Sequence, residues 1–434
     1  MTTPRIAHRA ILRLAVPALG TLAIDPVLTL IDTAFVARVG VDELAALGVD
    51  TAILGFAFFG FNFLAYATTP LVAQALGRGN PGEARRWVGD ALLLAAGLGV
   101  LAAAILELLA PWFVGLMGAG EGVAEAAVSY LRIRAIATPA VLIVTAAHGA
   151  FRGHQDTRTP LLVAVGINVI NLVFDPLLIF VAGLGLEGAA LGTVIAQWAG
   201  AAWFLILVRR RRLADRPGPL RQAIPTILSL ARSGMLVAIR TGFLLAGLTI
   251  AAATATRLGP SEIAAHQVVM QVWLLAAMVA DAFAIAAQAM VGAAVGSGDS
   301  LRIHRLSSRL LAWGVATGVL LLAVFALGAP ALELLVEDPE VAALTISAAA
   351  VAGWMMPVGA PLFVADGIFF GLLAFGTIIL STAVGAVVLI TLITATPLGE
   401  TLDGIWWGIS AMLAARGLVF VFAYRRAVGV ALRS

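Results

Sequence analysis

The sequence contains no cysteine and no lysine, and only 12% of its 434 residues are charged. The missing cysteine excludes disulfides, thiolate nucleophiles and cysteine-ligated metal sites. All 27 basic residues are therefore arginine, which we interpret as a compositional bias. There is no Walker A loop, which argues against ATP-driven transport, and the five histidines show no HExxH spacing. No catalytic constellation can be assembled from the sequence, so we predict that the chain is not an enzyme and needs no cofactor.

Apolar residues dominate what is present, at 61% of the chain, and the mean hydropathy is +1.03. A soluble domain of this composition would expose more apolar surface than water tolerates. Apolar runs of about 18 residues or more recur along the chain, which predicts an all-α polytopic membrane protein. We predict twelve spans, at 11–35, 44–76, 87–110, 123–147, 159–182, 187–208, 224–256, 262–295, 306–328, 341–371, 373–395 and 402–424.

The loops between these spans alternate between arginine-rich and acidic or neutral segments. By the positive-inside rule, both termini are cytoplasmic, as expected for an even number of spans in an inner membrane. The basic linker 209–223 divides the chain into an N-lobe, 1–208, and a C-lobe, 224–434, of six spans each. The pI near 10.1 comes from loop arginines and favours contact with anionic membrane lipid rather than nucleic acid.

The two halves resemble each other, which predicts a parallel repeat with a pseudo-twofold axis along the membrane normal. A shift of 219 places "VARVGVDELAALG" on "ATRLGPSEIAAHQ" and "ALGRGN" on "AVGSGD", and a shift of 218 places "AHGAFRG" on "ADGIFFG". Residues present in both copies are most simply scaffold, whereas residues without a counterpart are better functional candidates. Asp32 falls on Ala251. At a shift of 216, Asn171 falls on Val387 and Asp175 falls on Thr391, so the second half has no acid at these positions either.

Acids inside the first and fifth spans are the main candidate site. A charge at mid-bilayer costs about 2.5–3.5 kcal/mol on insertion scales, so such groups usually line a cavity or pair with each other. Asp25 and Asp32 lie two helical turns apart and hence on similar faces of one helix. Asp32 is either an ion-coupling group or an interfacial cap, and Asp25 lies nearer the membrane midplane, where it is a candidate for binding substrate.

The fifth span carries Asn168, Asn171 and Asp175 on one polar stripe, which indicates either a site or hydrogen bonding between helices. Asp175 shares its predicted depth with Asp32, with Thr193 of the sixth span and with Tyr130 of the fourth. Such oxygen ligands suit a proton or Na⁺ rather than a transition metal.

Other polar groups within the spans have weaker interpretations. Arg240 and Asp281 fall at mid-depth on neighbouring spans, which predicts a buried ion pair. Asp366, matched by His148 in the repeat, is either a proton-handling gate or an interface residue. Glutamines that either line a cavity or bridge helices are Gln74, Gln267 and Gln288. Prolines expected to kink or unwind helices are Pro17, Pro26, Pro139 and Pro176.

Several segments together resemble the MATE (multidrug and toxic compound extrusion) transporters, especially the bacterial branch named for DNA-damage-inducible protein F. They are "PALGTLAIDPVLTLIDTAFVARVG", "ALGRGNPGEARR", "AAHGAFRGHQDTRTP", "INVINLVFDPLLIF…GLEGAALGTVIAQ" and "EIAAHQVVMQVW". The resemblance implies two six-helix bundles, alternating access and cation-coupled export of amphipathic, often cationic compounds by a monomer. It also implies an N-lobe ion site, with Pro17 in the region of the first helix that bends. The residues carried over to that site are Asp32, Asn171, Asp175, Thr193 and Tyr130.

One departure from the family concerns the seventh span, where another bacterial branch has an acid and this chain has Arg240. The departure favours ion coupling through the N-lobe, by H⁺ or Na⁺. The nearest alternative is a flippase for a lipid-linked saccharide, in which Arg240 would hold a pyrophosphate. A channel remains a further alternative, although it would not need the repeat.

Overall fold

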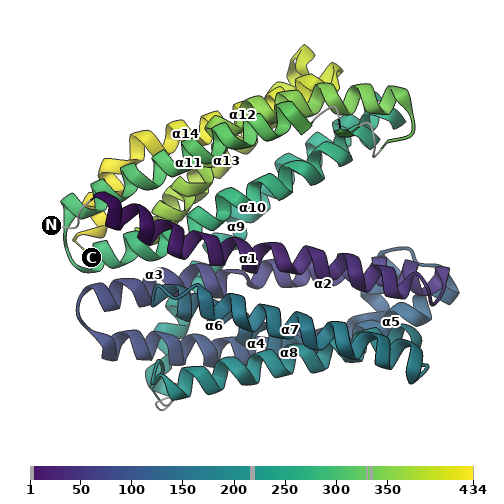
Figure 1. Cartoon of the computed structure of the whole chain (residues 1–434), viewed down its shortest axis with the longest axis horizontal. Coiled ribbons are helices and arrows are strands. Elements are labelled where there is room, and N and C mark those ends of the chain that lie inside the picture. The colour runs from purple at the N-terminus through teal and green to yellow at the C-terminus, as the bar shows by residue number, and fades with distance from the viewer. Residues whose placement is uncertain (1–3, 216–219, 329–330, 333–335, 434) are drawn as a thin grey trace. The chain divides into compact units, whose positions relative to one another are not determined.

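A computed structural model describes residues 4–215, 220–328, 331–332 and 336–433, and these residues form helices joined by short loops (Figure 1). The helices of the first half are α1 (Pro4–Val36), α2 (Val41–Phe61), α3 (Phe63–Gly77), α4 (Pro81–Leu116), α5 (Glu121–Ala135), α6 (Thr138–Gly153), α7 (Arg158–Pro176), η1 (Leu177–Val181) and α8 (Gly185–Arg210). The helices of the second half are α9 (Leu220–Leu258), α10 (Pro260–Gly296), α11 (Ser300–Gly328), α12 (Pro339–Gly371), α13 (Phe375–Ala395), η3 (Pro397–Glu400) and α14 (Leu402–Ala431).

The predicted all-helical membrane architecture is confirmed. Among the described residues, 11 helical segments are long and apolar enough to cross a membrane, or 12 when the bent pair α5–α6 counts as one span. This pair bends by 51° just before Pro139, and η1 follows directly after Pro176. The unwinding expected at Pro17 and Pro26 is not found, because α1 continues as one helix through both. Pro139 lies in the first turn of α6, where backbone N–H groups have no partner within the helix, so its missing N–H costs no hydrogen bond.

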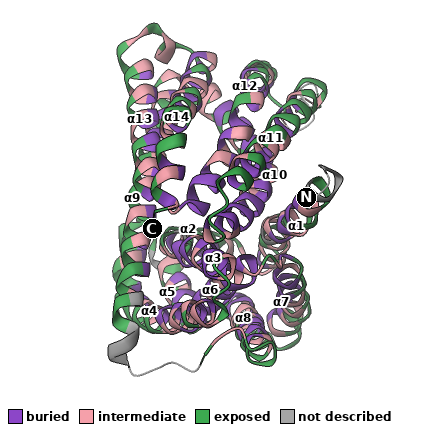
Figure 2. Cartoon of the chain, turned by 90° about the vertical axis from the view of Figure 1, so that its left-hand side faces the viewer, coloured by how far each residue is buried: buried purple, intermediate pink, exposed green. Residues whose placement is uncertain are grey.

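The helices form two compact units, and each is described by itself. The N-unit, Gly20–Gly234, contains the second part of α1, the helices α2 to α8 and the beginning of α9. The C-unit, Met1–Leu19 and Met235–Ser434, contains the first part of α1, the rest of α9 and the helices α10 to α14. In the N-unit, α6 packs against α3, α4 and α8; in the C-unit, α12 packs against α10, α11 and α14. Buried residues occupy the helix faces turned toward these neighbours (Figure 2).

Glycines permit close contacts between helices of the N-unit. A Cβ atom on Gly149 of α6 would lie 2.9 Å from Thr68 Cβ and 3.0 Å from the Ala65 backbone of α3. One turn later, a Cβ on Gly153 would lie 2.7 Å from Val72 Cβ. Apolar side chains gain little by leaving lipid for another helix, so membrane helices associate largely through such close packing of small residues. The pair therefore holds α6 on α3.

The C-unit repeats these contacts at the positions that the sequence shift of 218 predicts. Gly367 and Gly371 of α12 lie against the backbone of α10, at Ala284 and Gln288. The shared "GxxxG" segments are therefore scaffold in both units, as the sequence comparison predicts.

Loop conformations repeat as well. Gly79 and Gly298, offset by 219 residues, have φ angles of 72° and 69°. Gln155 and Leu373, offset by 218, have φ angles of 59° and 55°, although neither is glycine. A non-glycine residue in the left-handed region is uncommon, so the match between the two units indicates a common backbone rather than chance.

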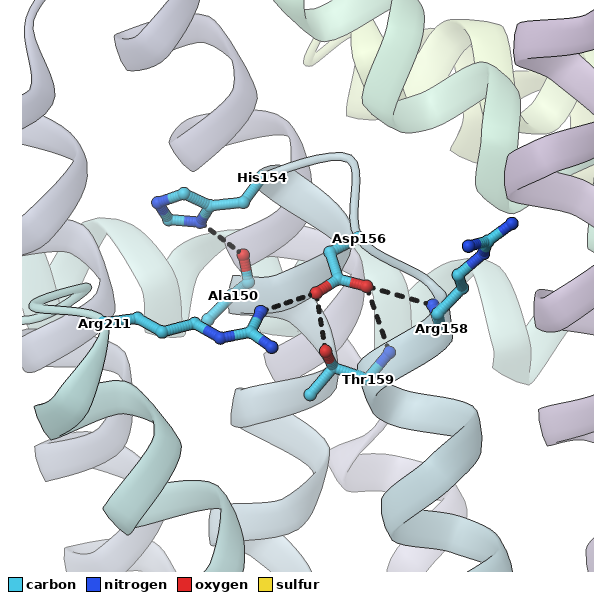
Figure 3. A network of polar contacts seen from close by, with 6 residues as sticks. All are labelled: Ala150, His154, Asp156, Arg158, Thr159 and Arg211. Carbon is cyan, nitrogen blue, oxygen red and sulfur yellow. Dashed lines mark hydrogen bonds and ion pairs between the residues drawn. The ribbon is translucent and has the colours of Figure 1, made fainter.

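The loop between α6 and α7 is organised by Asp156 (Figure 3). Its carboxylate accepts hydrogen bonds from the backbone N–H groups of Arg158 (3.1 Å) and Thr159 (3.0 Å) and from Thr159 Oγ1 (2.6 Å). Arg211, at the end of α8, donates a further bond of 2.8 Å. Burial alone would raise the pKa of Asp156, but the bonds from Thr159 and Arg211 outweigh it and hold this pKa below its ordinary value. Burial lowers the pKa of the adjacent His154, whose uncharged ring donates from Nδ1 to the Ala150 carbonyl oxygen at 2.8 Å.

Gly149→Ala tests the α3–α6 contact. The added methyl group meets backbone atoms that have no room to move, so we expect a loss of about 1–3 kcal/mol in unfolding free energy. The matched control is Gly97→Ala on α4, where an added Cβ meets nothing within 4 Å and the helix gains from the better helix former. Denaturation of the purified protein in mixed detergent micelles measures both. Equal stability of the two variants would contradict the proposed packing.

Asp156→Asn tests the loop network. At neutral pH we expect the variant to be less stable by about 1 kcal/mol, because the helix start and Arg211 lose a charged acceptor. Because the folded pKa of Asp156 is lowered, its stabilisation is present above the ordinary value of 3.8 and is lost as the pH falls through the folded value. Melting curves of the two proteins should therefore differ at pH 7 and converge well below pH 3.8. A difference that grows in acid would refute this assignment.

Candidate functional site

An amide and a carboxylate of α7 form the centre of a buried polar cluster in the N-unit. Asn171 and Asp175, one helical turn apart, are both fully buried. Asn171 Nδ2 donates to Asp175 Oδ1 at 2.9 Å and to Thr193 Oγ1 of α8 at 3.3 Å. The Thr193 hydroxyl in turn donates to the Ala189 carbonyl oxygen at 3.1 Å. Gly192 lies against the Asp175 carboxylate, so the absence of a side chain there makes room for the acid.

Asp32 joins this cluster from α1. Its carboxyl group lies close enough to that of Asp175 for the two groups to interact electrostatically. Asp32 Oδ1, Asp175 Oδ2 and Asn171 Oδ1 are buried, and none accepts a hydrogen bond from a described residue. Two carboxylates have no hydrogen to share, so their contact is favourable only when a proton or a cation lies between them. The arrangement thus has the chemistry of a site for a proton or a small cation.

Three further residues surround the pair of acids. Tyr130 and Arg134 lie one turn apart on α5, and Asp50 of α2 is fully buried with no donor to either of its oxygens among the described residues. The Arg134 guanidinium lies close enough to interact electrostatically with Asp32, Asp50 and Asp175. Arg134 Nε and Nη1 are buried and donate to no described residue. The site is therefore three acids around one fixed positive charge, with Tyr130 among them.

An apolar shell surrounds this charged group. It includes Val36 of α1, Ala46 and Ile53 of α2, Leu131 of α5 and Leu186 of α8, all of them buried. Low polarity strengthens every charge–charge interaction inside the shell, and it raises the cost of leaving any one charge unbalanced. The energy of this part of the N-unit is therefore sensitive to any change in the charge of the three acids.

The sequence prediction missed Asp50 and Arg134, although both carry the signal that identifies Asp32. Each is a charged residue inside a predicted apolar span, 44–76 or 123–147. The prediction did bring together five residues that lie together in the structure, namely Asp32, Asn171, Asp175, Thr193 and Tyr130.

Other predicted residues of the N-unit lie outside the cluster or outside what is described. Asn168 uses its Nδ2 to bond the Ala164 carbonyl oxygen of its own helix at 2.7 Å, so its amide group does not extend the stripe to the acids. Gln74 is buried on α3. The side chain of Asp25 lies outside the described residues, and Pro17 and Pro26 lie within the continuous helix α1.

The C-unit has a separate buried charge network. Asp366 of α12 accepts two hydrogen bonds from Arg416 Nη2 of α14, at 2.7 and 2.9 Å, and one from Arg240 Nη2 of α9 at 2.8 Å. Arg416 is 1% exposed and Asp366 is 4% exposed. Asp281 of α10 is close enough to interact electrostatically with all three. The four groups balance in charge when both acids are ionised.

The predicted pair of Arg240 and Asp281 lies within a larger network than the sequence indicates. Arg240 forms an ion pair with Asp366 at 2.8 Å and also interacts electrostatically with Asp281. Equal depth along neighbouring spans brought Arg240 and Asp281 together in the prediction, but it did not identify Asp366 as a partner of Arg240. The prediction also missed Arg416, although this residue interrupts the apolar span 402–424. Of the two glutamines on α10 that the sequence prediction singled out, Gln288 is buried and Gln267 is exposed.

Comparison with known proteins now adds to this geometry. The family model MatE matches residues 17–177 and 238–395. Protein DETOXIFICATION 44, chloroplastic, of Arabidopsis thaliana is 34% identical over 94% of this chain and 80% of its own length. DNA damage-inducible protein F of Escherichia coli strain K12 is 29% identical over 97% of this chain and 92% of its own.

A similar extent of likeness is found with two further proteins. A probable multidrug resistance protein, NorM of Deinococcus radiodurans, is 30% identical over 97% of this chain and 96% of its own. The crystal structure of the Vibrio cholerae MATE transporter VcmN in the bent form shares the fold, with a TM-score of 0.90 and 20% identity over 98% of each chain. With most of its length matched by the family model and by these relatives, the chain belongs to the MatE family of multi-pass membrane transporters.

Proposed function

We propose that the protein is a cation-coupled antiporter that exports amphipathic, often cationic molecules by alternating access. It would act as a monomer in the inner membrane with both termini in the cytoplasm, as the arginine-rich loops favour. The name of one relative, a probable multidrug resistance protein, is consistent with this substrate class. The proposed coupling residues are Asp32, Asn171, Asp175, Thr193 and Tyr130.

The contact between the carboxyl groups of Asp32 and Asp175 carries the proposal. In an apolar shell, two such groups bind a proton or cation between them or else repel each other. Asn171 fixes one oxygen of Asp175 at 2.9 Å, which leaves the other oxygen for the ion. The site therefore gains or loses a positive charge with little change of its own structure, as a coupling site requires.

The coupling step follows from charge balance. When an ion enters from outside and binds to the pair, the net negative charge of the acids falls by one, which weakens their attraction for a cationic substrate, and the substrate leaves outward. The site with its bound ion then opens inward and releases the ion down its gradient. Loss of the ion restores the negative charge that attracts the next substrate. Ion and substrate thus compete for the same carboxylates, and their exchange couples the two fluxes.

Of the two candidate ions, the proton is the one that Arg134 favours. A proton bonds covalently to one carboxylate oxygen and needs no further ligand and almost no space. Na⁺ needs several oxygen ligands around it, in space that it would share with the Arg134 guanidinium. Because Arg134 interacts electrostatically with all three acids, we expect it to compete with Na⁺ for their oxygens.

The flippase alternative loses its main support. It required Arg240 to hold the pyrophosphate of a lipid-linked saccharide, yet the Arg240 guanidinium is bound to Asp366 at 2.8 Å. Asp366 also forms an ion pair with Arg416, and the two arginines and two acids of the network balance in charge. Moving Arg240 to a pyrophosphate would leave this buried network with an unbalanced negative charge. We therefore assign Arg240, Asp281 and Asp366 a structural role in the C-unit rather than a substrate role.

Asp32→Asn and Asp175→Asn test the coupling site. In proteoliposomes with an imposed ion gradient, we expect export in each variant to fall to the rate of passive leak, because an amide cannot bind and release the ion. Asp42→Asn, at the exposed start of α2, is the matched control and should export normally. Undiminished gradient-driven export in both site variants would sink the proposal.

Arg134→Met tests the choice of ion. Removing the guanidinium should allow a Na⁺ gradient at equal pH on both sides to drive export, which we expect to be absent in the natural protein. Arg132→Met is the control, because Arg132 lies two residues away, is half exposed and contacts Glu107 at 3.6 Å. Equal Na⁺-driven export by the natural protein and the Arg134 variant would show that Arg134 does not select the ion.

A further inference from the structure

A cavity of about 760 Å³ lies in the N-unit between the beginning of α4 and the end of α8. These two helix ends lie at the same end of the unit (Figure 1). One part of its lining is charged, with Arg85, Arg209, Arg212 and Asp215. The other part is apolar, with Leu92, Leu93, Ala96, Ile143, Leu205 and Val208. The cavity thus has a charged rim and an apolar wall, and neither belongs to the acid cluster.

The segment that follows α8 closes one side of this cavity through specific contacts. Asp215 accepts a bond from Arg85 Nε at 2.8 Å, and its own N–H donates to the Arg85 carbonyl oxygen at 3.4 Å. A Cβ on Gly89 would lie 3.1 Å from the Asp215 carbonyl oxygen, so glycine admits the segment to α4. Arg211 anchors the same segment to Asp156 (Figure 3). The cavity is therefore built by ion pairs rather than by a loose loop.

Two arginines give the rim an excess of positive charge. Arg85 is balanced by Asp215, whereas Arg209 and Arg212 form no ion pair with any residue that the structure describes. Arg212 has a φ of 53°, the left-handed conformation with which α8 ends, and the Leu213 N–H donates to the Val208 carbonyl oxygen at 2.9 Å. This helix end places the second guanidinium at the cavity.

The apolar wall distinguishes this site from a binding place for a free anion. On α4 the lining extends from Arg85 to Ala96, which is about 16 Å at 1.5 Å per residue. On α8, Leu205 lies one turn before Arg209 and is 41% exposed. A small anion would contact only the rim and not the wall. A molecule with an anionic head and an apolar chain contacts both.

We propose that this cavity binds an anionic glycerophospholipid, with its phosphate on Arg209 and Arg212 and an acyl chain along the wall of α4 and α8. The positive-inside rule places this end of the unit at the cytoplasmic leaflet, where anionic lipids meet basic pockets between helices. The lipid bridges α4, α8 and the segment 211–215, and thereby stabilises the N-unit. The proposal depends on neither the coupling ion nor the exported substrate.

The test uses the full-length protein purified in a neutral detergent and its melting temperature with added phosphatidylglycerol or phosphatidylcholine. We expect phosphatidylglycerol alone to raise the melting temperature, and the double variant Arg209→Gln/Arg212→Gln to lose this rise. The control pair Arg210→Gln/Arg302→Gln removes the same charge from exposed positions that do not line the cavity, and should keep the rise.

Two further measurements distinguish a bound lipid from a bound free anion. Inorganic phosphate and glycerol 3-phosphate should give no rise, because neither reaches the apolar wall; an equal rise with either would replace the lipid site by an anion site. Ala96→Trp keeps every charge and fills the wall, and should weaken the rise. A rise lost equally in the control pair, or no rise in the natural protein, would overturn the proposal.

Discussion

Close approach of helix backbones at glycine is the contact on which both units depend. In lipid, apolar side chains gain little by leaving one apolar environment for another, so dispersion between closely packed surfaces takes the place of the hydrophobic effect. Gly149 and Gly153 bring α6 against α3, and Gly367 and Gly371 bring α12 against α10. Each central helix can then contact several neighbours, and the remaining helices arrange around it.

A glycine at a close helix contact also makes room for the polar cluster of the N-unit. Gly192 leaves the space that the Asp175 carboxylate fills, and α8 lies close enough for Thr193 to receive a bond from Asn171. In the C-unit, tight packing has the opposite use, because Asp366 is enclosed between two arginines that satisfy both of its oxygens. The N-unit thus has buried acid oxygens that accept no hydrogen bond from the described residues, whereas both oxygens of Asp366 in the C-unit accept hydrogen bonds from arginine.

Much of this organisation could be predicted from the sequence. Apolar runs identify the spans because lipid forces helices, and the i, i+4 spacing of Asn171 and Asp175 predicts one face. Which faces of distant helices meet could not be predicted, since depth along a span leaves rotation about its axis open; the contact of Arg240 with Asp366 was therefore not foreseen. Arg134 and Arg416 were overlooked although each interrupts a predicted apolar span, which is the signal that identified Asp32.

The division of α1 and α9 between the two units places a glycine at each boundary. Within the described residues, α1 passes from one unit to the other at Leu19–Gly20, and α9 passes at Gly234–Met235. Gly20 lies against Leu161 of α7 and Gly234 lies against Phe63 of α3, so each glycine lets its helix pack closely within the N-unit at the residue where the helix enters it. A larger side chain at either position would therefore disturb the N-unit at its two chain boundaries.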